Sequence, residues 1–95
     1  MGKIKSVIYC SASWCQPCKT LKPIMDEIMS EERFNDVNYK KIDIENDEEA
    51  EEVVEAFKIR NVPTVLFLDE NNELLFKFVG AMPKQSILTQ IEEND

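Results

Sequence analysis

Two cysteines, Cys15 and Cys18, lie where an apolar run gives way to a segment with helical spacing. Residues 7–10 are Val, Ile, Tyr and Cys, and after the pair apolar residues recur every three or four positions. Cysteines three positions apart at the start of a helix share one face, close enough for their sulfurs to bond, whereas on a strand they would diverge. The motif therefore predicts a strand, a turn and a helix, with a dithiol redox site at the turn.

The same pair has two other interpretations. A closed zinc site needs four ligands, but the chain has three Cys and no His, so zinc is disfavoured. An inert structural disulfide is the second alternative, although Trp14 before the pair and Pro17 within it are hard to explain for a plain cross-link. The pattern favours redox chemistry and leaves the structural disulfide open.

Length and charge indicate a single-domain protein and argue against nucleic acid as a partner. The 95 residues suffice for one domain, which would bury roughly 60 to 65 percent of its unfolded surface. The net charge of −8 would repel a polyanion, so nucleic acid is not expected as a partner. No run approaches the roughly 18 apolar residues of a membrane span, and no export signal is present. We therefore expect a cytoplasmic protein without a membrane partner, in which any disulfide is transient or catalytic.

The periodicity predicts alternating strands and helices. Apolar, β-branched runs predict strands at residues 4–10, 37–44, 64–69 and 73–79, the last two joined by a hairpin turn. Helical spacing predicts helices from residue 15, over residues 50–57 and after Pro83. The first two strands should be parallel and the last two antiparallel. The result is an α/β fold, a four-stranded mixed sheet with helices on both faces.

Several motifs in this order resemble thioredoxin, over nearly the whole chain. They are Trp-Cys-x-Pro-Cys-Lys at residues 14–19, the in-helix Pro23, Lys-Ile-Asp at 41–43, Arg-x-Val-Pro-Thr at 60–64 and Val-Gly-Ala at 79–81. The resemblance implies a single thioredoxin-like three-layer domain over residues 1–95. Family members commonly have an extra strand and helix at the N-terminus, for which this chain lacks room. The strand at 37–44 is then expected to lie at a sheet edge.

The resemblance implies a thiol-disulfide oxidoreductase, a protein-disulfide reductase that carries electrons. Free backbone N–H groups and the helix dipole should favour a thiolate at Cys15, the nucleophile. Cys18 should release the mixed disulfide from one turn deeper, and its burial is expected to order the two steps. No cofactor beyond this redox-active disulfide is expected. The implied partners are protein disulfides and an external thioredoxin reductase, and the chain should be a monomer.

The resemblance also assigns a substrate-binding surface. Pro63 is expected to be cis and to face the cysteines, leaving the Val62 backbone free to pair with an extended substrate. Trp14 and Gly80 should border this surface, although Trp14 could instead fill the core. Gln16 is expected to support the active site at a position where glycine is commonest in the family. The change from glycine should shift the redox potential, and the sequence does not give the sign of the shift.

A further departure from the family concerns Tyr9, which occupies the usual position of a buried carboxylate that helps to deprotonate the second cysteine. Lys41, the family partner of that acid, is expected to face Tyr9 instead. Water or the leaving thiolate would then accept the proton of Cys18. The third cysteine, Cys10, is expected to be a core residue.

Two other functions remain as alternatives. A glutaredoxin-like enzyme would use glutathione, but the chain lacks the tyrosine usual after the active-site proline and the paired glycines of the glutathione site. A redox-independent binding subunit would use the same apolar surface to hold a partner.

Overall fold

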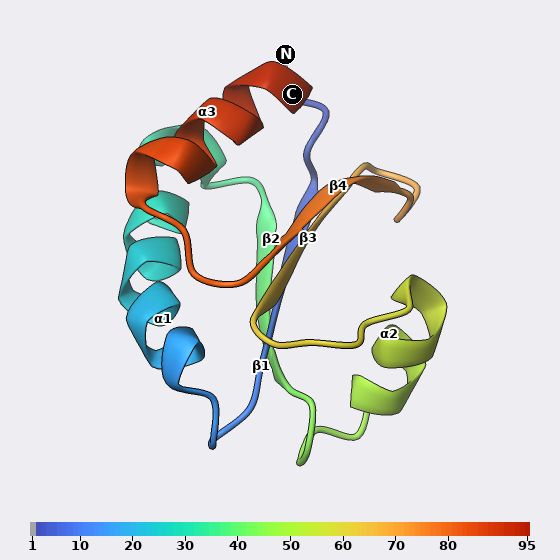
Figure 1. Cartoon of the computed structure of the whole chain (residues 1–95). Helices are drawn as coiled ribbons and strands as arrows, with labels where there is room; N and C mark the ends of the chain where they lie inside the picture. Colours follow the sequence, from blue (N-terminus) through green and yellow to red (C-terminus); the bar gives the residue numbers. More distant parts are fainter. Residues whose placement is uncertain (1) are drawn as a thin grey trace.

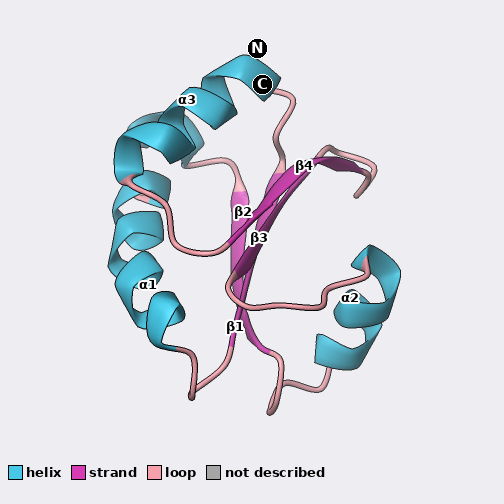
Figure 2. Ribbon diagram, in the orientation of Figure 1, coloured by secondary structure: helices cyan, strands magenta, loops and turns pink. Residues whose placement is uncertain are grey.

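A four-stranded sheet separates two layers of helices in the computed structural model, which describes residues 2–95 (Figures 1 and 2). The strands are β1 (Ser6–Ser11), β2 (Asn38–Asp43), β3 (Thr64–Leu68) and β4 (Leu74–Val79). The helices are α1 (Gln16–Met29), α2 (Ala50–Phe57) and α3 (Lys84–Asn94), with a 3₁₀ turn at Glu32–Phe34. The predicted order of elements and the mixed α/β fold are confirmed.

The sheet order is β2-β1-β3-β4. β1 pairs with β2 in parallel and with β3 antiparallel, and β3 pairs with β4 antiparallel. β2 is an edge strand of the described sheet, as predicted. β1 begins two residues later than expected, although the Lys5 N–H still donates to the Leu68 carbonyl at 2.8 Å.

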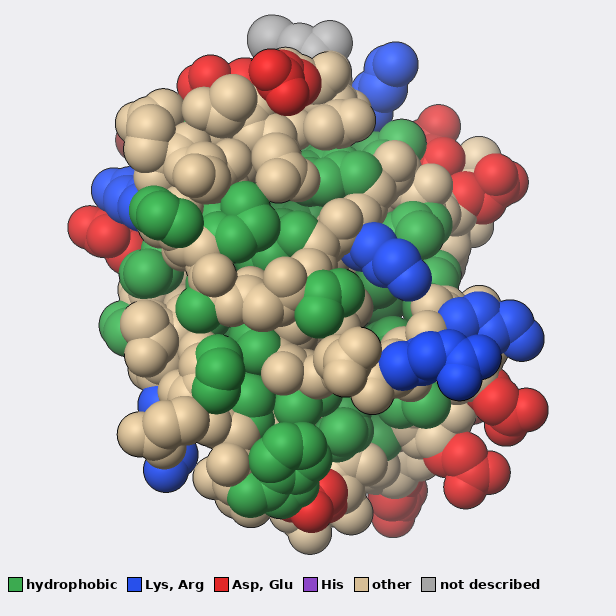
Figure 3. All heavy atoms as spheres, viewed as in Figure 1, with side chains coloured by type: hydrophobic (Ala, Val, Ile, Leu, Met, Phe, Trp, Pro, Cys, Tyr) green, Lys and Arg blue, Asp and Glu red, His purple; other side chains and the backbone are tan. Residues whose placement is uncertain are grey.

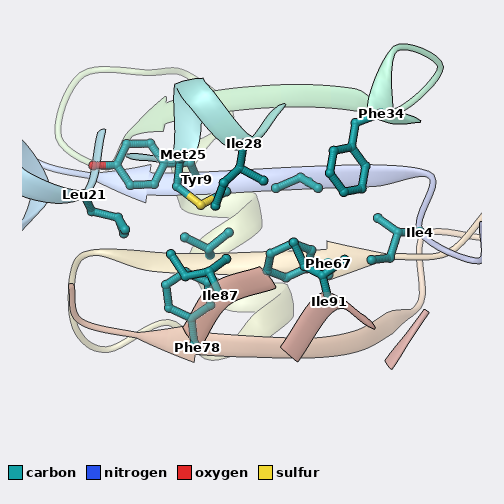
Figure 4. Packing of buried hydrophobic residues seen from close by; sticks show 12 residues of the cluster. Ile4, Tyr9, Leu21, Met25, Ile28, Phe34, Phe67, Phe78, Ile87 and Ile91 are labelled. Carbon is teal, nitrogen blue, oxygen red and sulfur yellow. The ribbon is translucent and has the colours of Figure 1, made fainter. Parts of the chain in front are cut away.

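Two apolar layers cover the two faces of the sheet. Side chains of β3 alternate between them, because successive residues of a strand point to opposite faces. Val65 and Phe67 join the core beneath α1 and α3, whereas Leu66 and Leu68 join the cluster on the α2 side. Figure 4 shows the first layer, with Tyr9, Phe67 and Phe78 from the sheet and Leu21, Met25, Ile28, Ile87 and Ile91 from the helices. This double burial explains why every residue of β3 is buried.

The loops that follow β1 and β2 lie at the same end of the sheet, as do the start of β3 and the end of β4 (Figure 1). The Cys-x-x-Cys segment is in the loop and first turn after β1. The fold thus brings four segments distant in sequence to one end of the molecule. No helix in residues 2–95 is long and apolar enough to cross a membrane.

Candidate active site

Cys15 is the N-cap of α1 and has an extended backbone, with φ −88° and ψ 108°. Its Sγ accepts a hydrogen bond from the backbone N–H of Cys18, 3.2 Å away. Gln16 and Pro17 form the start of the helix and are exposed, and the missing N–H of Pro17 costs nothing there because N–H groups in the first turn lack helical partners. The sulfur therefore stands in the capping position where a thiolate is best stabilised.

Cys15 and Cys18 are joined as a disulfide, with their Cα atoms 5.3 Å apart. Each residue is 3% exposed. The expectation that Cys18 is buried is confirmed, but burial cannot order the two chemical steps because Cys15 is equally buried. The two positions differ instead in their place on the helix, since Cys15 faces the N–H groups of the first turn and Cys18 is part of that turn.

The Val62–Pro63 peptide bond is cis, as the resemblance implies. Val62 packs against the small cluster formed by Ala12, Cys15 and Cys18. Within residues 2–95 its backbone N–H and C=O make no hydrogen bond, whereas the Pro63 carbonyl accepts from the Gly80 N–H at 2.9 Å. Gly80 has φ +90°, a conformation that favours glycine. Val62 thus offers a free backbone edge beside the disulfide.

Trp14 is 65% exposed, so its interpretation as core filler is wrong. The indole N–H donates to the Glu45 carboxylate at 2.8 Å, and the Ser13 hydroxyl donates to the same carboxylate at 3.3 Å. Glu45 was not predicted from the sequence. The only clue to it was its position after the second strand, since the loops after two adjacent parallel strands must lie side by side. The ring is held on the surface next to Cys15.

The expected meeting of Tyr9 and Lys41 is wrong. The two residues are aligned neighbours on β1 and β2, but the Tyr9 ring fills the core beneath α1 and its hydroxyl donates to the Cys18 carbonyl at 2.6 Å. The exposed Lys41 Nζ instead donates to Asp26 Oδ1 of α1, 3.2 Å away. Tyr9 therefore contacts the active-site turn, and Lys41 links β2 to α1.

Asp26 is a second site residue that was not predicted from the sequence. Partial burial disfavours its charged form, but hydrogen bonds from Lys22, Lys41 and the Tyr39 hydroxyl outweigh this and lower the pKa of the carboxyl group. Burial, and then the nearby charge of Asp26, raise the pKa of Tyr9 to about 12. Tyr9 is accordingly a neutral hydrogen-bond donor and not a proton acceptor for Cys18 at neutral pH.

A hollow of about 170 Å³ lies beside Cys18, lined also by Tyr9, Lys19, Lys22 and Asp43. Lys19, Lys22 and Asp43 give this hollow polar groups to which water can bond. Cys10, by contrast, is a free thiol within the cluster on the α2 side of the sheet, and burial raises its pKa to about 11. The prediction that Cys10 is a core residue is confirmed.

Comparison with known proteins agrees with this geometry. The thioredoxin family model matches residues 2–93. The chain belongs to the thioredoxin family. This membership places it in a class of thiol-disulfide oxidoreductases.

Individual thioredoxins match most of the chain. It is 40% identical over 83 residues to thioredoxin of Buchnera aphidicola subsp. Acyrthosiphon pisum, covering 87% of the chain and 72% of that relative. It is 37% identical over 82 residues to an M-type chloroplastic thioredoxin of Spinacia oleracea, covering 86% of the chain but 42% of that relative. The crystal structure of Malassezia sympodialis thioredoxin superposes with a TM-score of 0.79 at 26% identity, covering 98% of the chain and 76% of that structure.

Proposed function

We propose that this thioredoxin-family protein reduces protein disulfides through Cys15 and Cys18. The Cys15 thiolate attacks one sulfur of a substrate disulfide, forming a mixed disulfide and releasing the other substrate sulfur as a thiolate. The Cys18 thiolate then attacks Cys15 Sγ, which restores the Cys15–Cys18 bond and releases the second substrate thiolate. Two electrons pass to the substrate, and the oxidised form of this cycle is the disulfide seen in the structure.

The observation that carries the proposal is the capping position of Cys15. Its sulfur accepts the Cys18 N–H at 3.2 Å, at the positive end of α1. A thiolate there gains a charge-assisted hydrogen bond and a favourable helix dipole, both of which lower the pKa of a cysteine. The active form at neutral pH would therefore be the thiolate of Cys15.

The substrate would bind as an extended segment along Val62. The unbonded backbone N–H and C=O of Val62 supply the edge for strand addition, and Trp14 and Gly80 border it. Pro63 would support this surface next to the cysteines, and Gln16 and Pro17 would flank it.

Proton transfer from Cys18 would use water in the adjacent hollow or the leaving thiolate, because Tyr9 is a donor. No bound cofactor is needed, since the disulfide itself carries both electrons. An external reductase of the thioredoxin reductase type would return the protein to its dithiol form. We also propose that the protein acts as a monomer in the cytoplasm. Reducing conditions there would keep Cys10 as a free thiol.

The test is reduction of a protein disulfide such as insulin with dithiothreitol as electron donor. Cys15→Ser should abolish catalysis, and Cys18→Ser should accumulate a mixed disulfide that a mass spectrum detects. Cys10→Ala is the matched control and should retain catalysis, because Cys10 is a buried free thiol that belongs to the core cluster on the α2 side of the sheet.

Two outcomes would overturn the proposal. Catalysis that survives Cys15→Ser would exclude this dithiol as the reactive group. Turnover with glutathione but none with a thioredoxin reductase would favour the glutaredoxin-like alternative.

A further inference from the structure

Three basic side chains gather on a protein that is otherwise strongly acidic. The chain has 11 Lys and Arg against 19 Asp and Glu. Within residues 2–95, ion pairs engage Lys22, Arg33, Lys40, Lys41 and Lys84. The other six basic residues form no such pair in this part of the chain, and three of them, Lys58, Arg60 and Lys77, lie together. Their positive charge is consequently available to another molecule.

These three residues line one surface hollow of about 370 Å³, together with Ile59, Asn61, Thr64 and Val79. Lys58 and Arg60 come from the connection after α2, and Lys77 comes from β4, so the tertiary structure assembles the group. We call Lys58, Arg60 and Lys77 the basic patch. Figure 3 shows Lys and Arg side chains gathered on the right of the face that is drawn, next to hydrophobic side chains.

The basic patch is continuous with the surface proposed to bind substrate. Arg60 precedes Val62 by two residues, and Val79, which is 51% exposed, directly precedes Gly80. Val79 is also the register partner of Thr64, the residue after Pro63. A segment bound along Val62 would therefore pass beside the basic patch close to its cysteine.

The opposite border of that surface carries negative charge. Glu45 holds the Trp14 indole at 2.8 Å, so a carboxylate lies at the Trp14 border and three cations lie at the Val79 border. Such a polarised surface favours one orientation of a charged partner and disfavours the reverse.

We infer that the basic patch binds an acidic segment next to the reactive disulfide of the protein substrate. The inference rests on the proposed function and adds a substrate preference to it. The occupant is a run of Asp or Glu in a polypeptide and not a nucleic acid, because the remainder of a protein with net charge −8 repels a long polyanion.

The test compares pairs of disulfide-linked peptides that differ only in carrying Glu or Gln, in a series with increasing separation from the cysteine. With dithiothreitol as donor and at low ionic strength, kcat/KM should be about threefold to tenfold higher for the Glu peptide. The double variant Lys58→Gln, Lys77→Gln should reduce this ratio to about one, and high salt should do the same to the natural protein.

The matched control is Lys3→Gln, Lys5→Gln. It removes the same charge from two exposed lysines beside the end of β3 that is remote from Thr64, so the Glu preference should persist. Equal kcat/KM for both peptides in the natural protein, or a preference that survives in the Lys58, Lys77 variant, would overturn the inference while leaving disulfide reduction intact. No reduction of either peptide would overturn the proposed function and this role of the patch with it.

Discussion

Tyr9 shows how one side chain can change the support of an active-site turn. Its hydroxyl donates to the Cys18 carbonyl at 2.6 Å in a buried setting, and its raised pKa, about 12, keeps it protonated across the physiological range. A neutral donor holds the first turn of α1 where a carboxylate would present a charge. Position 9 therefore contributes to the structure around Cys18 and supplies no proton acceptor there at neutral pH.

Tyr9→Phe should lower the free energy of unfolding by about 1 kcal/mol, because it removes a buried hydrogen bond and keeps the ring in the core. Urea denaturation measures the change. The comparison is Tyr39→Phe, which removes a hydroxyl bonded to the ionised Asp26 at 3.1 Å, so its effect should decrease as acid protonates Asp26, whereas that of Tyr9→Phe should not. An unchanged free energy of unfolding for Tyr9→Phe would contradict the importance assigned to the Cys18 contact.

Residue-level prediction succeeded where the chemistry is local in sequence. The Cys15–Cys18 pair follows from spacing, and the cis state of Pro63 followed from the family resemblance. The partner of Lys41 could not be found in this way, because Asp26 lies fifteen residues away on a helix whose rotation about its axis decides what it meets.

At the scale of elements, α2 ends in an unusual way. Lys58 follows its last residue with φ 55°, a left-handed conformation in which the Cβ atom of a non-glycine residue is strained. Its N–H closes the helix on the Val54 carbonyl. The connection from Lys58 then leads to Val62 and Pro63, so the end of α2 positions part of the proposed substrate surface.

Lys58→Gly should raise the free energy of unfolding by about 0.5 kcal/mol, since glycine relieves the left-handed strain by more than its flexibility costs the folded state. Lys58→Ala is the control, because it removes the same charge and keeps the Cβ. Chemical denaturation of both variants separates the effects. Equal stabilisation by Gly and Ala would show that charge, and not backbone conformation, governs this position.

The existence and order of elements were predictable because their periodicities differ. The β-branched and aromatic run of β3 and the helical spacing of α1 identify each type, but the ends of the elements were less certain. Cys15, expected as the first helical residue, is the cap of α1, since its extended backbone lets Sγ accept a hydrogen bond. Such details depend on hydrogen bonds that periodicity does not report.

For the whole molecule, Asp26 connects two elements across the edge of the sheet. It accepts hydrogen bonds from Lys22 on its own helix and from Tyr39 and Lys41 on β2. These bonds lower the pKa of the Asp26 carboxyl in the folded state. Ionised Asp26 thus stabilises the packing of α1 against the edge strand.

Stability should consequently decrease as acid protonates Asp26. A carboxyl whose folded pKa lies below its unfolded value of about 3.9 stabilises the fold above that pH and loses this contribution as the pH falls through the folded pKa. Urea denaturation between about pH 6 and pH 2 should show a steeper decrease for the natural protein than for Asp26→Asn. Parallel pH profiles for the two proteins would contradict this role.

The sequence by itself determined the class of fold and the reactive pair. Both depend on short-range spacing, which sets helix, strand and the approach of two sulfurs one turn apart. Tertiary structure alone decided the contact of Trp14 with Glu45, that of Lys41 with Asp26, and the assembly of the basic patch from the connection after α2 and from β4. These contacts join residues far apart in the chain, so they depend on strand register and on the reach of side chains between packed elements.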